Sequence, residues 1–323
     1  MNIVSNMRFS VIIPLYNKEA YVRKALESVI AQTFKDFECI VVDDGSTDNS
    51  ADVVRELVND RFRLIRQPNA GVAAARNNGV KASKGEYVCF LDADDWWEPN
   101  FLEEMDRLIK EYPDAGLYAT NYVYYKPGKT HVASKLKRGY MNYPEAYLRS
   151  GAMPVTSITT CMLRKVFDET GGFPVGIKLG EDFLLWAKTA LHYKVAFCEK
   201  PLAYYNNDIP VSLRATRNLH KPQYHMLFNL GEIEEELRDK SEESRVIWKA
   251  LLDKLRVSGL MDYWLNDEYH DAAAEELKKV DWSKQSKKTK ALYEKQMWLL
   301  KAQRRFMQIG SYWKQKLILY LWK

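Results

Sequence analysis

The sequence predicts an α/β fold in which a mostly parallel sheet is flanked by helices and followed by a C-terminal helical extension. Short apolar runs alternate with amphipathic stretches through the first half of the chain, which is the order of strands and helices in such a sheet. After about Arg214, glycine and proline become infrequent while Leu, Lys, Glu, Trp and Tyr dominate, as in consecutive helices. We therefore expect one domain over residues 1–213 and a helical extension over residues 214–323.

The individual elements follow from local patterns. Short, mainly apolar runs predict strands at Phe9–Pro14, Phe37–Val42, Phe62–Ile65 and Tyr87–Leu91. Apolar residues at helical spacing predict helices at Tyr21–Ala31, Asp48–Val58, Val72–Ala82 and Glu181–Leu191. Between residues 118 and 212 the pattern is irregular, and we expect this part to complete the sheet.

The composition is that of a globular protein, with 46% hydrophobic and 28% charged residues among 323. No apolar run approaches the roughly 20 residues of a membrane-spanning helix, and the N-terminus lacks the small-residue cleavage site of a signal peptide. We therefore expect a cytoplasmic protein. The net charge of +5 is modest and the basic residues are interleaved with acidic ones, which disfavours nucleic-acid binding and suits an anionic small substrate or an anionic membrane surface.

The cysteines and histidines do not form metal-binding patterns. The cysteines are far apart and mostly have apolar neighbours, which predicts buried reduced thiols at Cys39, Cys89, Cys161 and Cys198. The histidines show no ligand spacing. We therefore expect neither a disulfide nor a zinc site.

Polar segments follow three of the predicted strands directly. They comprise residues 15–18 (Leu-Tyr-Asn-Lys), 43–46 (Asp-Asp-Gly-Ser) and 92–95 (Asp-Ala-Asp-Asp). Ligands of open α/β sheets lie beyond the carboxyl ends of the strands. We therefore expect these segments to form the functional site.

The cluster at residues 92–95 carries three carboxylates, which repel one another unless a positive charge neutralises them. Mg²⁺ and Mn²⁺ take oxygen ligands, commonly one or two carboxylates together with substrate phosphates. A metal that bridges a diphosphate is therefore the preferred interpretation. The alternative is that these aspartates only cap the helix expected near Pro99.

The second acidic cluster carries Asp43 and Asp44. The glycine that follows permits a tight turn, and Thr47 or Asp48 would cap the next helix. Two adjacent carboxylates exceed what a cap requires, so one of them is available to accept hydrogen bonds from a base or a ribose. Tyr16, at the end of the first strand, would lie nearby and could stack on a base, or it is an ordinary aromatic residue at a strand end.

Three segments together resemble the family 2 glycosyltransferases, which have a GT-A (Rossmann-like) fold. They are FSVIIPLYNKEAYVRKALESVIAQTFKDFECIVVDDGSTDNS, NAGVAAARNNGVKASKGEYVCFLDADD and GGFPVGIKLGEDFLLW, and the resemblance covers about the first 210 residues. It implies transfer of a hexose or N-acetylhexosamine from a nucleotide diphosphate sugar, with UDP expected as the nucleotide. The acceptor would be a hydroxyl of a glycan or lipid-linked molecule, with Mn²⁺ or Mg²⁺ as cofactor and inversion at the anomeric carbon.

The resemblance also implies residue roles. Pro14 and Tyr16 would line a uracil pocket, and Asp44 would recognise the base. Lys18 and Arg76 would contact the diphosphate. Asp92 and Asp94 would form the metal site, with Asp94 as the direct ligand, and Asp182 would be the catalytic base. A hydroxyl acceptor needs such a base because it is a poor nucleophile at neutral pH. Two alternatives stay open: Arg76 as a solvated surface residue, and the Glu181-Asp182 pair as compensation of a helix dipole. Trp96 and Trp97 could form a platform for a sugar ring, although one of them is expected in the core.

The sequence departs from the family where many members place a histidine near the diphosphate. The corresponding stretch, YYNNDIPVSLRATR, has none, so a contact there must come from Asp208, Ser212, Arg214 or Arg217. The Gln-x-x-Arg-Trp signature of processive relatives and membrane helices are also missing, which predicts the addition of one sugar at a time.

Two other functions are less consistent with the sequence. A nucleotidyltransferase would want a glycine-rich basic loop after the first strand, which LYNKEA is not. A catalytically silent nucleotide-sugar-binding module is disfavoured because the predicted metal and base residues are all present. The C-terminal segment SYWKQKLILYLWK has two alternative roles: peripheral contact with a membrane, or packing against the catalytic domain.

Overall fold

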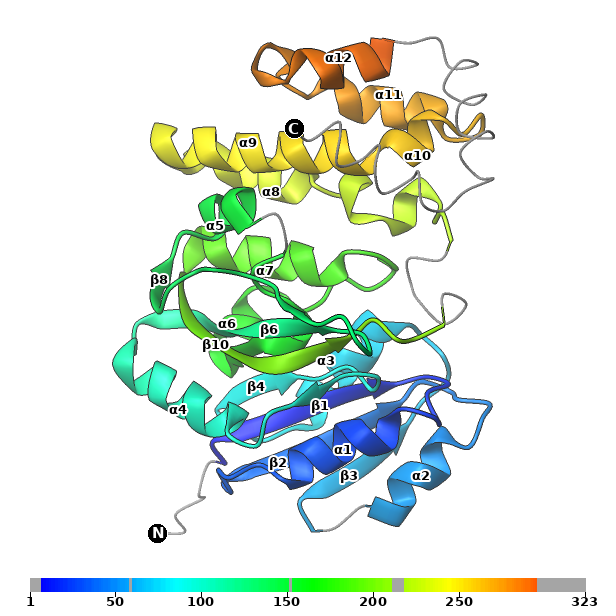
Figure 1. Cartoon of the computed structure of the whole chain (residues 1–323), viewed down its shortest axis with the longest axis vertical. Coiled ribbons are helices and arrows are strands. Elements are labelled where there is room, and N and C mark those ends of the chain that lie inside the picture. Colours follow the sequence, from blue (N-terminus) through cyan, green and yellow to red (C-terminus); the bar gives the residue numbers. More distant parts are fainter. Residues whose placement is uncertain (1–6, 58–59, 151–152, 211–217, 295–323) are drawn as a thin grey trace. The chain divides into compact units, whose positions relative to one another are not determined.

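The computed structural model describes residues 7–57, 60–150, 153–210 and 218–294 (Figure 1). The chain separates into two compact units, Met1–Trp248 and Lys249–Lys323. The boundary expected near Arg214 stays a prediction. The first unit contains one sheet with the strand order β3-β2-β1-β4-β9-β6-β10-β5.

The first half of the sheet is parallel, as expected. Its strands are β1 (Phe9–Leu15), β2 (Phe37–Asp43), β3 (Phe62–Arg66) and β4 (Tyr87–Phe90), with β1 between β2 and β4. Its helices are α1 (Val22–Ile30), α2 (Ser50–Leu57) and α3 (Val72–Ala82). α2 begins where Asp48 Oδ1 accepts the Ser50 N–H at 3.0 Å, which confirms Asp48 as the cap.

Helices cover both faces of this half because alternate residues of β1 point to opposite sides. Val11 and Ile13 belong to the apolar cluster that includes the buried residues of α1. Ile12 faces α3, where a Cβ at Gly79 would lie only 2.4 Å from Ile12 Cγ2. The missing side chain of Gly79 therefore lets α3 approach the sheet closely.

The second half of the sheet is mixed, which the sequence did not predict. Its strands are β5 (Trp96–Trp97), β6 (Ala115–Tyr125), β7 (His131–Val132), β8 (Gly139–Met141), β9 (Thr160–Leu163) and β10 (Lys194–Asn206). Its helices are α4 (Phe101–Glu111), α5 (Tyr143–Ser150), α6 (Arg164–Glu169) and α7 (Glu181–His192). β6 and β10 are parallel, whereas the short β9 lies antiparallel between β4 and β6. β9 thus joins the parallel strands β1–β4 to the parallel pair β6 and β10.

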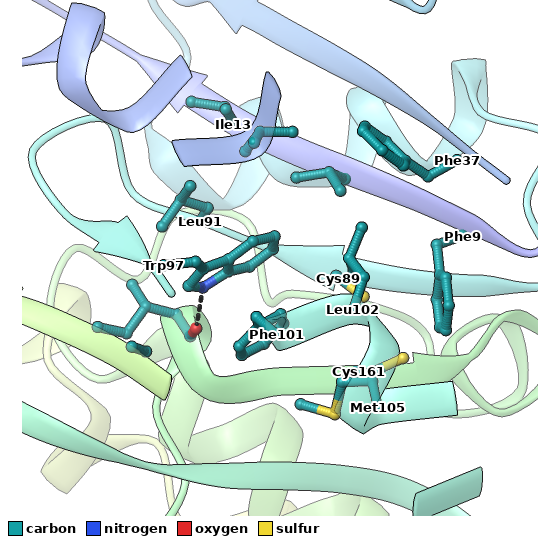
Figure 2. Packing of buried hydrophobic residues seen from close by; sticks show 14 of the residues in the cluster. Phe9, Ile13, Phe37, Cys89, Leu91, Trp97, Phe101, Leu102, Met105 and Cys161 are labelled. Carbon is teal, nitrogen blue, oxygen red and sulfur yellow. Dashed lines mark hydrogen bonds between the residues drawn. The ribbon is translucent and has the colours of Figure 1, made fainter. Parts of the chain in front are cut away.

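The buried apolar cluster combines aromatic with aliphatic side chains (Figure 2). Trp97 stacks on Phe101 with ring centroids 4.0 Å apart and planes 8° apart, and its Nε1–H donates to the Ile158 carbonyl at 2.6 Å. Trp97 is therefore a core residue. Trp96 is partly exposed and stacks on Tyr204 with centroids 5.1 Å apart. All the cysteines are buried and free, as expected.

Residues 218–294, the described part of the chain after the sheet, are mainly helical, as the composition predicted. The α-helices are α8 (Gly231–Glu236), α9 (Glu242–Gly259), α10 (Met261–Trp264), α11 (His270–Lys278) and α12 (Lys287–Glu294). In the second unit, the buried Arg256 pairs through Nε with Glu276 Oε2 at 3.0 Å. Within the described ranges no helix is long and apolar enough to span a bilayer. Residues 311–323, for which membrane contact was considered, lie outside those ranges, so that contact stays a prediction.

Candidate active site

The segments after β1 and β2 are tied together at the carboxyl edge of the sheet. Asn17, with φ of 51°, donates its N–H to Ser46 Oγ at 3.1 Å and accepts the Thr47 N–H through Oδ1 at 2.8 Å. The N–H of Lys18 donates to Ser50 Oγ at 2.8 Å. These bonds hold the first two polar segments side by side, as expected for neighbouring strands.

Lys18 joins these segments to the acidic cluster after β4. Its Nζ lies 2.5 Å from Asp94 Oδ2, and both side chains are only 17% exposed. Burial raises the pKa of the Asp94 carboxyl and the charge of Asp92 adds to this, whereas Lys18 opposes it. A cation and a carboxylate cluster therefore meet where the resemblance placed the diphosphate.

Arg76 connects the acidic cluster to α7 from inside the protein. Nη2 lies 2.6 Å from Asp92 Oδ1 and Nη1 lies 2.8 Å from Glu181 Oε1. The residue is only 3% exposed and its guanidinium lies 5.0 Å from the centre of the Phe173 ring. Burial alone would lower the pKa of Arg76, but the charges of Asp92 and Glu181 outweigh it and raise the pKa. The alternative of a solvated surface arginine is therefore wrong.

Asp182 lies in the first turn of α7, beside the partner of Arg76. Its Oδ1 accepts the Phe183 N–H at 2.8 Å. Burial raises the pKa of Asp182 to about 7, the charge of Glu181 adds to the shift and Arg76 opposes it. The two adjacent carboxylates thus differ. Glu181 forms an ion pair with Arg76, whereas the raised pKa of Asp182 allows it to take up a proton near neutral pH.

Asp95 holds the end of β10 and does not cap a helix. Its Oδ1 accepts the Asn206 N–H at 2.7 Å, and the residue is buried. α4 begins after Asn100 without a side-chain cap, so capping does not explain the acidic cluster. Of the residues considered for the diphosphate after β10, Asp208 is exposed. The others, Ser212, Arg214 and Arg217, lie outside the described residues.

Asp44 organises the segment that leads into α3. Its Oδ1 accepts from Gln67 Nε2 at 2.7 Å and from the Ala70 N–H at 2.8 Å, and its Oδ2 accepts from the Gly71 N–H at 2.8 Å. Pro14 is buried within β1, whereas Tyr16 is 47% exposed. The uracil pocket predicted at these residues stays a prediction, and the structure adds a scaffold role for Asp44.

The predicted metal ligands fit a hard divalent cation. Asp92 and Asp94 offer carboxylate oxygens, and their side chains are 29% and 17% exposed, so both reach solvent. Among the described residues, no group of three His, Cys, Asp or Glu side chains is arranged to hold a metal ion. A metal held by one or two carboxylates and completed by a diphosphate does not need such a group.

The start of α7 is fixed by a later segment that the sequence pattern did not reveal. Lys178 N–H donates to the Tyr224 carbonyl at 2.8 Å, and Met226 N–H donates to the Leu179 carbonyl at 3.0 Å. Gly180 has φ of 84°, and a Cβ there would lie 2.4 Å from Met226 Sδ. The residues just before the Glu181-Asp182 pair are therefore held by residues 224–226.

Gly180→Ala is expected to destabilise the protein more than Gly171→Ala. Both glycines have φ of 84°, so both substitutions carry the same left-handed strain of about 1–2 kcal/mol. A Cβ at Gly171 meets nothing within 4 Å, whereas one at Gly180 meets Met226 and adds roughly 1–3 kcal/mol of overpacking. Urea unfolding followed by tryptophan fluorescence measures the difference, and equal losses would show that Met226 does not constrain α7.

Comparison with known proteins identifies the family and the fold. Residues 10–171 match the profile described as Glycosyl transferase family 2. Glycosyltransferase GlyA of Streptococcus pneumoniae is 44% identical over 117 residues, which cover 36% of this chain and 17% of GlyA. The putative glycosyltransferase EpsH of Bacillus subtilis is 38% identical over 146 residues, which cover 44% of this chain and 42% of EpsH. The chain thus matches less than half the length of either relative.

The fold is similar to that of S. aureus TarS. The structure of TarS 1-349 in complex with UDP-GlcNAc superposes with a TM-score of 0.72 at 23% identity, covering 84% of this chain and 80% of that one. This likeness confirms the expected GT-A fold. Since the family profile covers half of the sequence, the chain belongs to glycosyl transferase family 2.

Proposed function

We propose that the chain transfers a hexose or N-acetylhexosamine from a UDP-sugar to a hydroxyl of a glycan or lipid-linked acceptor. The observation that carries this proposal is the convergence of Lys18 with Asp94, and of Arg76 with Asp92 and Glu181, at one edge of the sheet. The names of GlyA and EpsH support the reaction class, and the UDP-GlcNAc complex of TarS supports the donor class.

The donor side of the site would bind and neutralise the diphosphate. Asp92 and Asp94 would hold Mn²⁺ or Mg²⁺, which supplies positive charge for the departing diphosphate when bound. Lys18 contributes a further cation at the same place, and Arg76 keeps Asp92 in position from the buried side. Tyr16 is exposed enough to stack on a base.

The acceptor side would use Asp182 as the base. Its carboxylate takes the proton of the acceptor hydroxyl, the hydroxyl oxygen forms the new bond to the anomeric carbon, and the bond from that carbon to the diphosphate breaks with its electron pair leaving on UDP. A single displacement of this kind inverts the anomeric carbon. An α-linked donor would therefore give a β-linked product, which product NMR reveals.

Titration calorimetry with UDP, with and without MnCl₂, followed by a hydrolysis assay over a panel of UDP-sugars, tests the proposal. We expect UDP to bind more tightly with the metal and one UDP-sugar to be hydrolysed slowly to UDP. Binding without hydrolysis would favour a silent binding module, and release of pyrophosphate from UTP and a sugar phosphate would favour a nucleotidyltransferase. UDP at 100 times its dissociation constant should also stabilise the protein by about 2.7 kcal/mol.

Asp44→Ala is expected to weaken UDP binding by about 1–3 kcal/mol, because it leaves polar partners unpaired in a buried place. If Asp44 recognises the base, the substitution lowers the affinity for UDP and not that for ADP, so the preference for UDP over ADP disappears. Gln67→Ala is the matched control, since it removes one contact to Asp44 and leaves the carboxylate in place. Calorimetry with both nucleotides makes the comparison, and a mutant with parental UDP affinity would reduce Asp44 to its scaffold role.

A further inference from the structure

Tyr205 and Tyr124 lie side by side next to the acidic cluster. They are register partners on the adjacent parallel strands β10 and β6, and their rings meet edge to face with centroids 5.7 Å apart. The residue after Tyr205 is Asn206, whose N–H is held by Asp95. Burial raises the pKa of Tyr205, and the charges of Asp95, Asp92 and Asp94 add to this shift.

Tyr147 on α5 packs against the helix that carries the candidate base. Its ring meets that of Phe183 at 90° with centroids 5.9 Å apart, and Phe183 directly follows Asp182. Burial and the charge of Asp182 raise the pKa of Tyr147 to about 12, and Tyr124 contributes to the same shift. Tyr147 therefore lies against the first turn of α7, which carries Asp182.

The hydroxyl groups show what this surface offers to a ligand. Tyr122 is buried and donates its hydroxyl hydrogen to the Met153 carbonyl at 3.1 Å. Its oxygen lies 2.9 Å from the Tyr124 oxygen, and because its only hydrogen is used, Tyr124 must be the donor between them. The remaining lone pair of Tyr124 can then accept a hydrogen bond from a ligand hydroxyl.

These tyrosines differ in exposure as a binding surface requires. Tyr205 is 39% exposed and Tyr124 is half-buried, whereas Tyr122 beneath them is buried. An exposed aromatic face packs against the C–H face of a sugar ring, and a phenol oxygen orients one of its hydroxyls. The nearby carboxylates disfavour an anionic ring.

We propose that Tyr124 and Tyr205 form the acceptor subsite and that it takes a neutral pyranose unit, a proposal that rests on the glycosyltransferase function proposed above. The ring packs on Tyr205, one hydroxyl donates to Tyr124, and the hydroxyl to be glycosylated faces Asp182. The subsite explains why tyrosines cluster at the ends of β6 and β10.

Saturation-transfer NMR tests the subsite on the full chain saturated with UDP and MnCl₂. The ligands are methyl β-D-glucopyranoside, methyl β-D-galactopyranoside and methyl N-acetyl-β-D-glucosaminide, with methyl β-D-glucuronide as the anionic comparison and sorbitol as the open-chain one. We expect at least one neutral pyranoside to bind through its ring C–H groups. The glucuronide and sorbitol should bind at least about tenfold more weakly.

Substitutions of Tyr205 and Tyr124 test whether these two residues bind the pyranoside. Tyr205→Ala should weaken the pyranoside roughly tenfold, Tyr205→Phe should restore it, and Tyr124→Phe should weaken it about threefold. Tyr140→Ala, which removes an exposed tyrosine of β8, is the matched control and should change nothing. UDP affinity should be parental in every variant, which also reports correct folding.

The outcomes separate the two proposals. A parent chain that binds and hydrolyses a UDP-sugar but binds no pyranoside overturns the subsite alone, as does parental pyranoside affinity in Tyr205→Ala. Stronger binding of the glucuronide or sorbitol than of every pyranoside overturns the choice of a neutral ring. A parent chain that neither binds UDP nor hydrolyses any UDP-sugar defeats the proposed function, and the subsite with it.

Discussion

Asp182→Asn is expected to lower acceptor-dependent turnover by roughly 10²–10⁴-fold, the usual contribution of a general base. Asparagine keeps the size of the side chain and the oxygen that accepts the Phe183 N–H, but it takes up no proton. UDP affinity should survive, because the base acts on the acceptor. Product formation at saturating donor, together with titration calorimetry for UDP, measures the two effects separately.

Two neighbouring substitutions make this test specific. Glu181→Gln weakens the ion pair with Arg76, so we expect it to act on donor binding more than on the proton transfer. Asp168→Asn changes an exposed aspartate of α6 and should have no effect. An Asp182→Asn variant with parental turnover, or an α-linked product from an α-linked donor, would remove Asp182 from the role of base.

The pH profile checks the same assignment. A base works only when it is deprotonated, so activity should be full above the pKa of Asp182 and should fall as the pH drops through it. The raised value of about 7 places this acidic limb close to neutral pH. The residual activity of Asp182→Asn should lack the limb altogether.

The parallel half of the fold could be predicted from the sequence almost residue by residue. The expected helix Val72–Ala82 matches α3, and the expected strand Phe37–Val42 is one residue shorter than β2. These elements are amphipathic or fully apolar and are bounded by turn residues, so local periodicity defines them. The acidic clusters were found for the same reason, because strand ends determine where ligands bind.

The second half could not be predicted in this way. β5, β7, β8 and β9 are two to four residues long, too short for alternation to be recognised, and their pairing depends on partners far along the chain. The same limit applies to the site. Arg76 and Glu181 are 105 residues apart, and nothing in the local pattern of either predicts the ion pair.

Interactions of this long-range kind change the interpretation of individual residues. An arginine on a helix is usually solvated, yet Arg76 is buried because two carboxylates compensate its charge. Asp44 was predicted as a residue that reads the base, yet it also holds the segment leading into α3. The sequence predicts which residues form the site, and the structure adds how they are supported.

Asp94→Ala is expected to abolish the metal dependence of UDP binding and to lower turnover on the order of 10³-fold, since a bound metal supplies several kcal/mol of charge stabilisation to a departing diphosphate. The ion pair with Lys18 sharpens this prediction. Removing the carboxylate frees the ammonium of Lys18 from Asp94, so UDP binding in a chelator should stay equal to that of the parent or become tighter.

Calorimetry with UDP in EDTA and in MnCl₂ separates these two effects. The parent should gain affinity with the metal, and Asp94→Ala should gain none. Asp168→Ala is the matched control for removing a carboxylate elsewhere and should keep the parental gain. In a Lys18→Ala, Asp94→Ala double variant the metal-independent binding should fall, because the ammonium of Lys18 is lost as well. Parental turnover in a chelator would exclude a metal from the reaction and leave Asp94 as the residue that positions Lys18.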